Sequence, residues 1–202
     1  MDETSGMWCG RAGFAVAVIV GLIGLGLVPV SAAGPCGPER SAPTDSGLYP
    51  LPEEGRWGYV DREGRWRIAP QWRQARPFSE GRAAVQNKNG WGVIDTAGDW
   101  IVKPGAVDAD AWIVDGQRYP LSPYRPASEG CIAATPAGGQ AHFLTLDGQR
   151  WDPPGLADEQ IVDLGSYSEG YARVRVVRDD EEVVGWIDTE GQWALAPEYS
   201  DG

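Results

Sequence analysis

Carboxylates recur along the chain at two fixed positions: an Asp three residues before a Gly, and the Glu of a Ser-Glu-Gly triplet. These acids are Asp61, Asp95, Asp188, Glu80, Glu129 and Glu169. Glycoside hydrolysis needs two carboxylates with different pKa values, so the acids raise the hypothesis of a small hydrolase. A catalytic pair is normally single and asymmetric, whereas these acids recur in successive segments. We therefore interpret them as turn residues and expect no catalytic site.

Tryptophan is unusually frequent, with ten residues in the chain, and its spacing supports two interpretations. Trp66, Trp100 and Trp193 recur in register with apolar neighbours, as the buried face of a strand does. Repeated Gly-Trp segments also occur in choline-binding wall modules, whose aromatic cages hold a cation, so a choline or wall-glycan site is the alternative. Four aromatics break the register or lie near loops, the fourth being Trp151, and we expect three of them to be at least partly exposed on a binding surface. These three are Trp72, Trp112 and Tyr199.

The sequence gives little support for a metal site or for a catalytic site with a nucleophile. Asp108, Asp110 and Asp115 are spaced somewhat like a calcium loop, but Trp112 stands where a further oxygen ligand belongs. His142 is the only histidine, so no Ser-His-Asp or Cys-His set can be assembled. We expect neither a metal nor a cofactor.

The N-terminus has the features of an export signal. Residues 12–30 are almost entirely apolar, and Ser31, Ala32 and Ala33 follow as small residues. This order is typical of a secretory signal peptide cleaved after Ala32 or Ala33. The 19-residue run is also just long enough to span a bilayer, so an uncleaved anchor that tethers the protein to the membrane is the alternative. We assign residues 1–33 to this segment and expect an extracytoplasmic location: secreted, periplasmic or on the cell surface.

Two cysteines remain if the signal is removed together with Cys9. Cys36 and Cys131 can form one disulfide in an oxidising compartment, or they can stay unpaired. Cys36 lies in residues 34–54, which are rich in Pro, Gly and Ser and show no apolar periodicity. This composition predicts a linker, followed by a folded domain at residues 55–202.

The formal net charge of -12 restricts the class of partner. Nucleic-acid binding needs a positive footprint, and adsorption to anionic lipid needs basic residues. We therefore expect no nucleic-acid partner, and favour a protein or a component of the cell envelope.

The folded part is built from repeats. Residues 57–61 (Trp-Gly-Tyr-Val-Asp) align with residues 91–95 (Trp-Gly-Val-Ile-Asp) and 184–188 (Val-Gly-Trp-Ile-Asp), and residues 141–145 form a worn copy. Asp at the first position and Gly at the fourth indicate a type I turn, in which the Asp side chain bonds to the backbone and Gly takes a positive φ. Each copy is therefore expected to begin with a hairpin.

The second strand of each hairpin alternates large apolar and polar residues, which is typical of a half-buried strand. Each Ser-Glu-Gly triplet then precedes a further short strand, which turns back into the next Trp-Gly strand. One repeat is thus a three-stranded antiparallel meander, and three full copies with a terminal half copy fill the domain. The extra residues 107–124 are expected to form a surface loop. The predicted fold class is all-β, a small stacked array of tandem repeats.

These segments identify a resemblance. Residues 56–72 (Arg-Trp-Gly-Tyr-Val-Asp-Arg-Glu-Gly-Arg-Trp-Arg-Ile-Ala-Pro-Gln-Trp), then Pro-Phe-Ser-Glu-Gly and Gly-Trp-Gly-Val-Ile-Asp, are similar to the bacterial WG-repeat family. The resemblance implies a β-repeat array in proteins that are often exported, with binding roles and no shared catalytic residues. We expect a non-catalytic, extracytoplasmic binding module. A wall-glycan or choline binder and a small envelope hydrolase are the alternatives.

Overall fold

The computed structural model describes residues 34–199 except for five gaps at residues 44, 106–110, 115–116, 121 and 138–139. At residues 111–114, 117–120 and 199 it describes the backbone but not the side chains. The described residues belong to one compact unit, Ser31–Gly202. None of its described helices is long and apolar enough to cross a membrane, and the apolar run at residues 12–30 lies outside the described residues.

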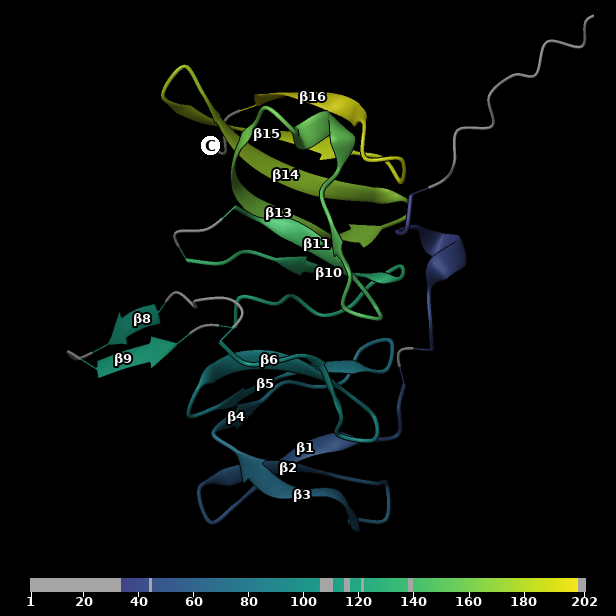
Figure 1. Cartoon of the computed structure of the whole chain (residues 1–202), viewed down its shortest axis with the longest axis vertical. Helices are drawn as coiled ribbons and strands as arrows, with labels where there is room; N and C mark the ends of the chain where they lie inside the picture. Colours follow the sequence, from purple (N-terminus) through teal and green to yellow (C-terminus); the bar gives the residue numbers. More distant parts are fainter. Residues whose placement is uncertain are drawn as a thin grey trace, which may run out of the picture. The chain divides into compact units, whose positions relative to one another are not determined.

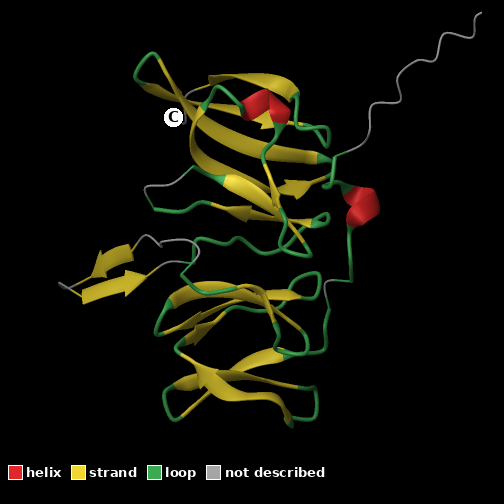
Figure 2. Ribbon diagram, in the orientation of Figure 1, coloured by secondary structure: helices red, strands yellow, loops and turns green. Residues whose placement is uncertain are grey.

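The described residues form four antiparallel sheets in chain order and one separate hairpin (Figures 1 and 2). The first sheet consists of β1 (Tyr49–Glu53), β2 (Arg56–Val60) and β3 (Trp66–Trp72). The second consists of β4 (Gln74–Ala75), β5 (Arg82–Asn87), β6 (Gly90–Asp95) and β7 (Trp100–Val102). The third consists of β10 (Cys131–Ala134), β11 (His142–Thr145) and β12 (Arg150–Trp151). The fourth consists of β13 (Gln160–Ser168), β14 (Tyr171–Arg178), β15 (Glu181–Ile187) and β16 (Trp193–Tyr199).

The all-β fold of tandem antiparallel meanders is confirmed, but the repeat boundaries are shifted by one strand. The strand after each Ser-Glu-Gly triplet pairs with the Trp-Gly strand that follows it, so it belongs to the new sheet instead of closing the previous one. In the second and fourth sheets a further strand, β4 or β13, precedes it. The expected surface loop at residues 107–124 contains the hairpin β8 (Ala111–Val114) and β9 (Gln117–Pro120). Two short 3₁₀ helices, Pro38–Arg40 and Pro154–Leu156, complete the described elements.

The segment expected to be a linker is part of the folded unit. Its last residues form β1, which pairs with β2 over the whole of its length and completes the first sheet. The two prolines of β1, Pro50 and Pro52, obscured the strand in the sequence, yet an edge strand tolerates proline because one side of it needs no ladder bonds. The start of the segment is also fixed, because Cys36 is fully buried and bonded to Cys131, with the two Cα atoms 5.4 Å apart.

The Asp-to-Gly turns have the predicted geometry. The Gly64 amide donates a hydrogen bond of 3.0 Å to the Asp61 carbonyl, and Gly64 has φ +78°. The Asp61 carboxylate accepts the amides of Arg65 and Glu63 at 2.9 and 3.1 Å. These bonds, led by that from Arg65, hold the pKa of Asp61 below its ordinary value. The recurring aspartates are therefore committed to shaping hairpins.

The glycine of the Trp-Gly pair has a different role, which the sequence did not indicate. A Cβ on Gly92 would lie 2.5 Å from the Val102 carbonyl oxygen and 2.7 Å from a ring carbon of Trp100. Gly58 and Gly185 are crowded in the same way by their own return strands. The return strand thus passes too close to the Trp-Gly strand for any side chain at this position. In the third sheet His142 occupies it, and the return strand β12 is only two residues long.

Replacement of Gly92 by Ala should lower the free energy of unfolding by about 2 kcal/mol, because overpacking of a tight contact typically costs 1–3 kcal/mol. Chemical denaturation followed by tryptophan fluorescence measures this loss. Gly165→Ala is the matched control, since its Cβ would come no closer than 3.3 Å to another atom. Equal losses in the two variants would contradict a steric role for Gly92.

Three apolar cores lie between successive sheets. The first core contains Tyr59, Ile68, Trp72, Phe78, Ala83, Val85 and Ile94. The second contains Ala84, Trp91, Val93, Tyr124, Ala127, Ile132, Ala134 and Leu144. The third contains Cys36, Cys131, Ala133, Ala141, Phe143, Leu156, Leu164, Tyr167, Ala172, Val174, Val176 and Ile187. The second and third sheets therefore bury both faces, while the first and fourth bury one face each.

Candidate functional site

The aromatic residues expected to form a binding surface do not come together. Trp72 is only 6% exposed and meets Trp100 edge-on, with ring centroids 5.0 Å apart, so it is a core residue and not part of an exposed face. Trp112 lies in β8 and Tyr199 at the end of β16, but their side chains are outside the described part of the structure. The candidate surface must therefore be sought elsewhere.

The chain's one histidine is a buried residue of β11. His142 is 7% exposed, and its Nδ1 lies 3.0 Å from the Gln140 carbonyl oxygen. Across the residues that the structure describes, no three His, Cys, Asp or Glu side chains are grouped to hold a metal ion. The Asp108, Asp110 and Asp115 set considered as a calcium loop lies outside those residues.

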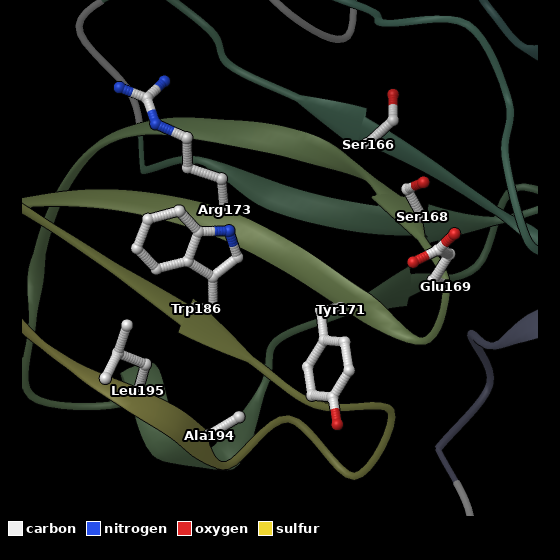
Figure 3. A pocket seen from close by; sticks show the side chains of 8 residues that line it. All are labelled: Ser166, Ser168, Glu169, Tyr171, Arg173, Trp186, Ala194 and Leu195. Carbon is white, nitrogen blue, oxygen red and sulfur yellow. The ribbon is translucent and has the colours of Figure 1, made fainter.

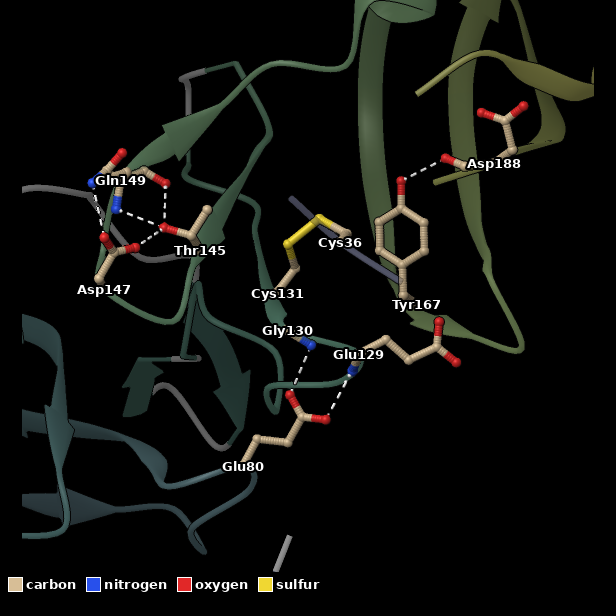
Figure 4. The surroundings of a disulfide bond; sticks show 10 residues. All are labelled: Cys36, Glu80, Glu129, Gly130, Cys131, Thr145, Asp147, Gln149, Tyr167 and Asp188. Carbon is tan, nitrogen blue, oxygen red and sulfur yellow. Dashed lines mark hydrogen bonds between the residues drawn. A yellow bond between two sulfur atoms is a disulfide. The ribbon is translucent and has the colours of Figure 1, made fainter. Parts of the chain in front are cut away.

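The glutamates of the Ser-Glu-Gly triplets connect one sheet to the next (Figure 4). Glu80 is 4% exposed, and its two carboxylate oxygens accept the amides of Glu129 and Gly130, each at 2.9 Å. Glu129 in turn accepts the amide of Gly170 at 2.9 Å. Each glutamate thus binds the backbone of the corresponding turn in the following sheet.

The turn backbone is shaped to receive this carboxylate. Glu80, Glu129 and Glu169 have φ values of +46°, +50° and +53°, and a glycine with positive φ follows each of them. Two consecutive left-handed residues form a two-residue hairpin turn of type I′. In the third sheet this turn directs the amides of Glu129 and Gly130 at the Glu80 carboxylate.

The serine of each triplet makes a second connection between sheets. Ser79 Oγ donates a 2.7 Å hydrogen bond to the carbonyl of Ala127, the residue before the next triplet. Ser128 Oγ donates an equal bond of 2.7 Å to the carbonyl of Tyr167, again the residue before the next triplet. Serine and glutamate therefore hold the same short stretch of the following sheet.

The residue before the triplet is the third component. Phe78 packs on Tyr59 of the preceding sheet with ring centroids 4.6 Å apart, and Tyr167 packs on Phe143 at 5.1 Å. Tyr167 also donates a 2.9 Å hydrogen bond to the Asp188 carbonyl, and burial raises its pKa well above the ordinary value for tyrosine. The aromatic ring, the serine bond and the glutamate bond occur together between the third and fourth sheets, whereas Ala127 stands before the triplet between the second and third sheets.

The fourth sheet presents the same set of positions, and among the described residues no sheet follows it. We call this surface the terminal face, and it consists of Ser168, Glu169, Tyr171, Arg173, Trp186 and Leu195. These residues line a shallow hollow of about 600 Å³, and Figure 3 shows their side chains on one side of the sheet.

The positions of the terminal face correspond to buried positions in earlier sheets. Trp186 aligns with Tyr59 and Phe143, which are both fully buried under the sheet that follows. Leu195 aligns with Ile68, which is 5% exposed, yet Leu195 itself is 44% exposed. The terminal face therefore corresponds to surfaces that are buried between sheets elsewhere, and no described sheet packs on it.

The serine and the glutamate of the terminal face also differ from their counterparts. In the described part of the chain, neither the Ser168 hydroxyl nor the Glu169 carboxylate has a hydrogen-bond partner, whereas their counterparts in the two preceding triplets all have one. The sequence showed that the triplet recurs, but not that it binds a segment between 39 and 50 residues further along. The recurrence of serine with glutamate was the available signal, because a turn alone does not require that pair.

The chain is thus a tandem β-repeat protein in which serine and glutamate bonds join the second sheet to the third and the third to the fourth. The family of the WG containing repeat matches residues 57–90, 91–105 and 185–201. These three matches support a protein of the WG-repeat family. The third sheet, where His142 replaces the repeat glycine, falls outside the matched segments. Comparison with curated proteins finds no match, and neither does comparison with solved structures.

Proposed function

We propose that this WG-repeat protein is a non-catalytic binding module that acts outside the cytoplasm and binds a protein or another envelope component through the terminal face. One observation carries the proposal: the terminal face has the groups that join sheets elsewhere, but no described residue covers it. Exposed apolar surface rimmed by polar groups is typical of interaction sites. Tyr171 and Leu195, exposed by 52% and 44%, supply the apolar part.

The engagement of the recurring acids supports a binding role over a catalytic one. Asp61 shapes a hairpin, and Glu80 and Glu129 hold neighbouring sheets. Carboxylates that already accept several backbone amides are poorly placed to act as a general acid or base.

The disulfide supports an extracytoplasmic location, because such bonds persist in oxidising compartments and are rare in the cytosol. Cys36 and Cys131 are bonded and almost fully buried. The apolar run at residues 12–30 agrees with export, either as a cleaved signal or as an anchor that tethers the folded unit.

Export is tested by expressing the protein with its own N-terminus and sequencing the mature product. We expect it to begin near Ala33 or Gly34 and to contain no free thiol. Full-length protein found only in the membrane fraction would identify residues 1–33 as an anchor. Reduced protein found only in the cytosol would contradict the proposed location.

A wall-glycan or choline-type ligand is the second candidate, since Trp186 and Tyr171 both lie at the terminal face (Figure 3). Aromatic rings attract quaternary ammonium groups through their π faces. Calorimetric titration with choline and with soluble peptidoglycan fragments tests this candidate directly, with Trp186→Ala as the variant that should abolish binding.

Binding through the terminal face is tested by crosslinking the purified protein in envelope extract. Leu195→Asp should abolish the crosslinked product, because it places a charge in the centre of the apolar surface. Leu51→Asp is a closely matched control, since Leu51 is also 44% exposed but lies in the first sheet. Equal crosslinking of the wild-type protein and of both variants would exclude the terminal face as the binding site.

A further inference from the structure

We infer that the terminal face recognises a β-hairpin turn of the form aromatic-Ser-Glu-Gly carried by a different polypeptide. The inference rests on the proposed function and specifies its partner. The internal contacts define what such a turn must offer: an aromatic ring and the carbonyl of that same residue, as in Tyr167, and one or two adjacent backbone amides.

The contact between the third and fourth sheets serves as a template. Tyr167 of the incoming turn inserts its ring against Phe143 and gives its carbonyl to Ser128. The turn then gives the amide of Gly170 to the carboxylate of Glu129. The incoming segment is Tyr-Ser-Glu-Gly, residues 167–170.

The contact between the second and third sheets supplies the same polar pattern. Ser79 holds the carbonyl of Ala127, and Glu80 holds both amides of the turn that follows it. The pattern therefore does not depend on one pair of sheets. Charge-assisted bonds from backbone amides to a carboxylate are about twice as strong as neutral ones, which makes the glutamate the main polar determinant.

The terminal face offers the receiving half of this contact. Trp186 stands at the position of Phe143, Ser168 at that of Ser128, and Glu169 at that of Glu129. Figure 3 shows Ser168 and Glu169 side by side at one end of the hollow and Trp186 across the sheet from them. The hollow lies where the aromatic ring of an incoming turn would pack. Ser168 and Glu169 make no hydrogen bond to any described residue there and can bind the backbone of that turn.

A second copy of this chain does not fit as the partner. Its own aromatic residues before the triplets, Phe78 and Tyr167, are 8% and 1% exposed, so neither is available to another molecule. The first sheet carries no Ser-Glu-Gly triplet at its start, and there the Gly47 amide donates to the carboxylate of Asp45 at 2.8 Å.

The partner is therefore another protein with an accessible turn of this kind, of which a further repeat of the same type on a separate chain is the plainest example. Pairing of different chains through such an interface needs no symmetry between the two surfaces.

The experiment titrates the full-length protein with a cyclic peptide that contains Arg-Pro-Phe-Ser-Glu-Gly-Arg-Ala, the sequence of residues 76–83, closed by a disulfide between added terminal cysteines. NMR first establishes that the peptide forms the left-handed Glu-Gly turn. We expect saturable binding, weakened at least tenfold by Glu169→Gln, by Trp186→Ala, and by replacing the peptide's phenylalanine with alanine.

Glu54→Gln is the matched control for Glu169→Gln. Glu54 has φ +48° in an exposed two-residue turn of the first sheet, so both glutamates have the same backbone conformation. Binding weakened equally by both substitutions would overturn the assignment to the terminal face, as would absence of binding to a peptide with the correct turn.

Two further measurements separate this inference from the proposed function. Envelope crosslinking that Leu195→Asp abolishes, combined with no peptide binding, would overturn the turn motif while the binding function stands. Sedimentation showing self-association that Glu169→Gln abolishes would overturn the assignment to a different chain. Loss of both peptide binding and envelope crosslinking at the terminal face would overturn the two together.

Discussion

Replacement of both Cys36 and Cys131 by alanine should lower the free energy of unfolding by about 4 kcal/mol, the largest effect expected of any substitution described above. The two cysteines are 95 residues apart in the sequence, so the bond closes a long loop in the unfolded chain. For a loop of about 100 residues the loss of chain entropy corresponds to about 4.7 kcal/mol, and measured values range up to about 5 kcal/mol. The bond also fixes residues 34–40 beside the third sheet, where the Gly37 amide donates to the Glu129 carbonyl at 2.8 Å.

Chemical denaturation with and without a thiol reductant measures this contribution. Reductant should shift the wild-type transition to that of the double variant and should leave the double variant unchanged. Thiol titration shows that the bond has been broken in the reduced sample. A wild-type transition that does not move after complete reduction would contradict a stabilising role for the bond.

The sequence predicted those parts of the fold that depend on neighbouring residues. The alternation of apolar residues and the Asp-to-Gly spacing are local patterns, and they correctly indicated hairpins, an all-β fold and tandem repeats. The positive φ of Gly64 and Gly98 follows from the same local pattern. Turn chemistry of this kind is decided within four residues, so one sequence is enough to predict it.

The contacts between sheets depend on residues far apart, and these the sequence did not disclose. The Glu80 carboxylate binds a turn 49 residues further along the chain, which no periodicity within a strand can indicate. Trp72 is out of register in the sequence, but in the structure it lies in the core between the first and second sheets and contacts Trp100 of the second sheet. The many prolines and glycines of residues 34–54 indicated a linker. The segment is instead fixed to the domain at its start by the disulfide and at its end by the edge strand β1, and neither contact can be seen in its composition.

The terminal face could be predicted only in part for the same reason. Ser168 and Glu169 were recognised as members of a recurring triplet, yet their partners in the other copies lie in another sheet. Only the comparison of equivalent positions in the folded protein shows that Trp186 occupies a place that is buried elsewhere. The candidate site therefore arises from the stacking of the repeats and not from any single repeat.

The bonds from the Glu80 carboxylate to the third sheet lead to the second large expected effect on stability. Glu80→Ala should lower the free energy of unfolding by about 3 kcal/mol, because it removes the acceptor of two buried amides, those of Glu129 and Gly130. Hydrogen bonds to charged groups contribute about 1.5–3 kcal/mol each, and a buried amide left without a partner adds its own cost. Chemical denaturation measures the loss, and hydrogen exchange should show faster exchange of these two amides.

Glu169→Ala is the internal control for this prediction. Glu169 has the same residue type, the same triplet and nearly the same φ as Glu80, +53° against +46°, but it clasps no described residue. Its replacement should change the free energy of unfolding by less than about 0.5 kcal/mol, as is usual for a surface substitution away from structural features. A large loss at both positions would mean that the glutamate acts within its own turn. A large loss at Glu80 alone would mean that it acts on the next sheet, so that the glutamate of the fourth sheet is the one that remains available to a partner.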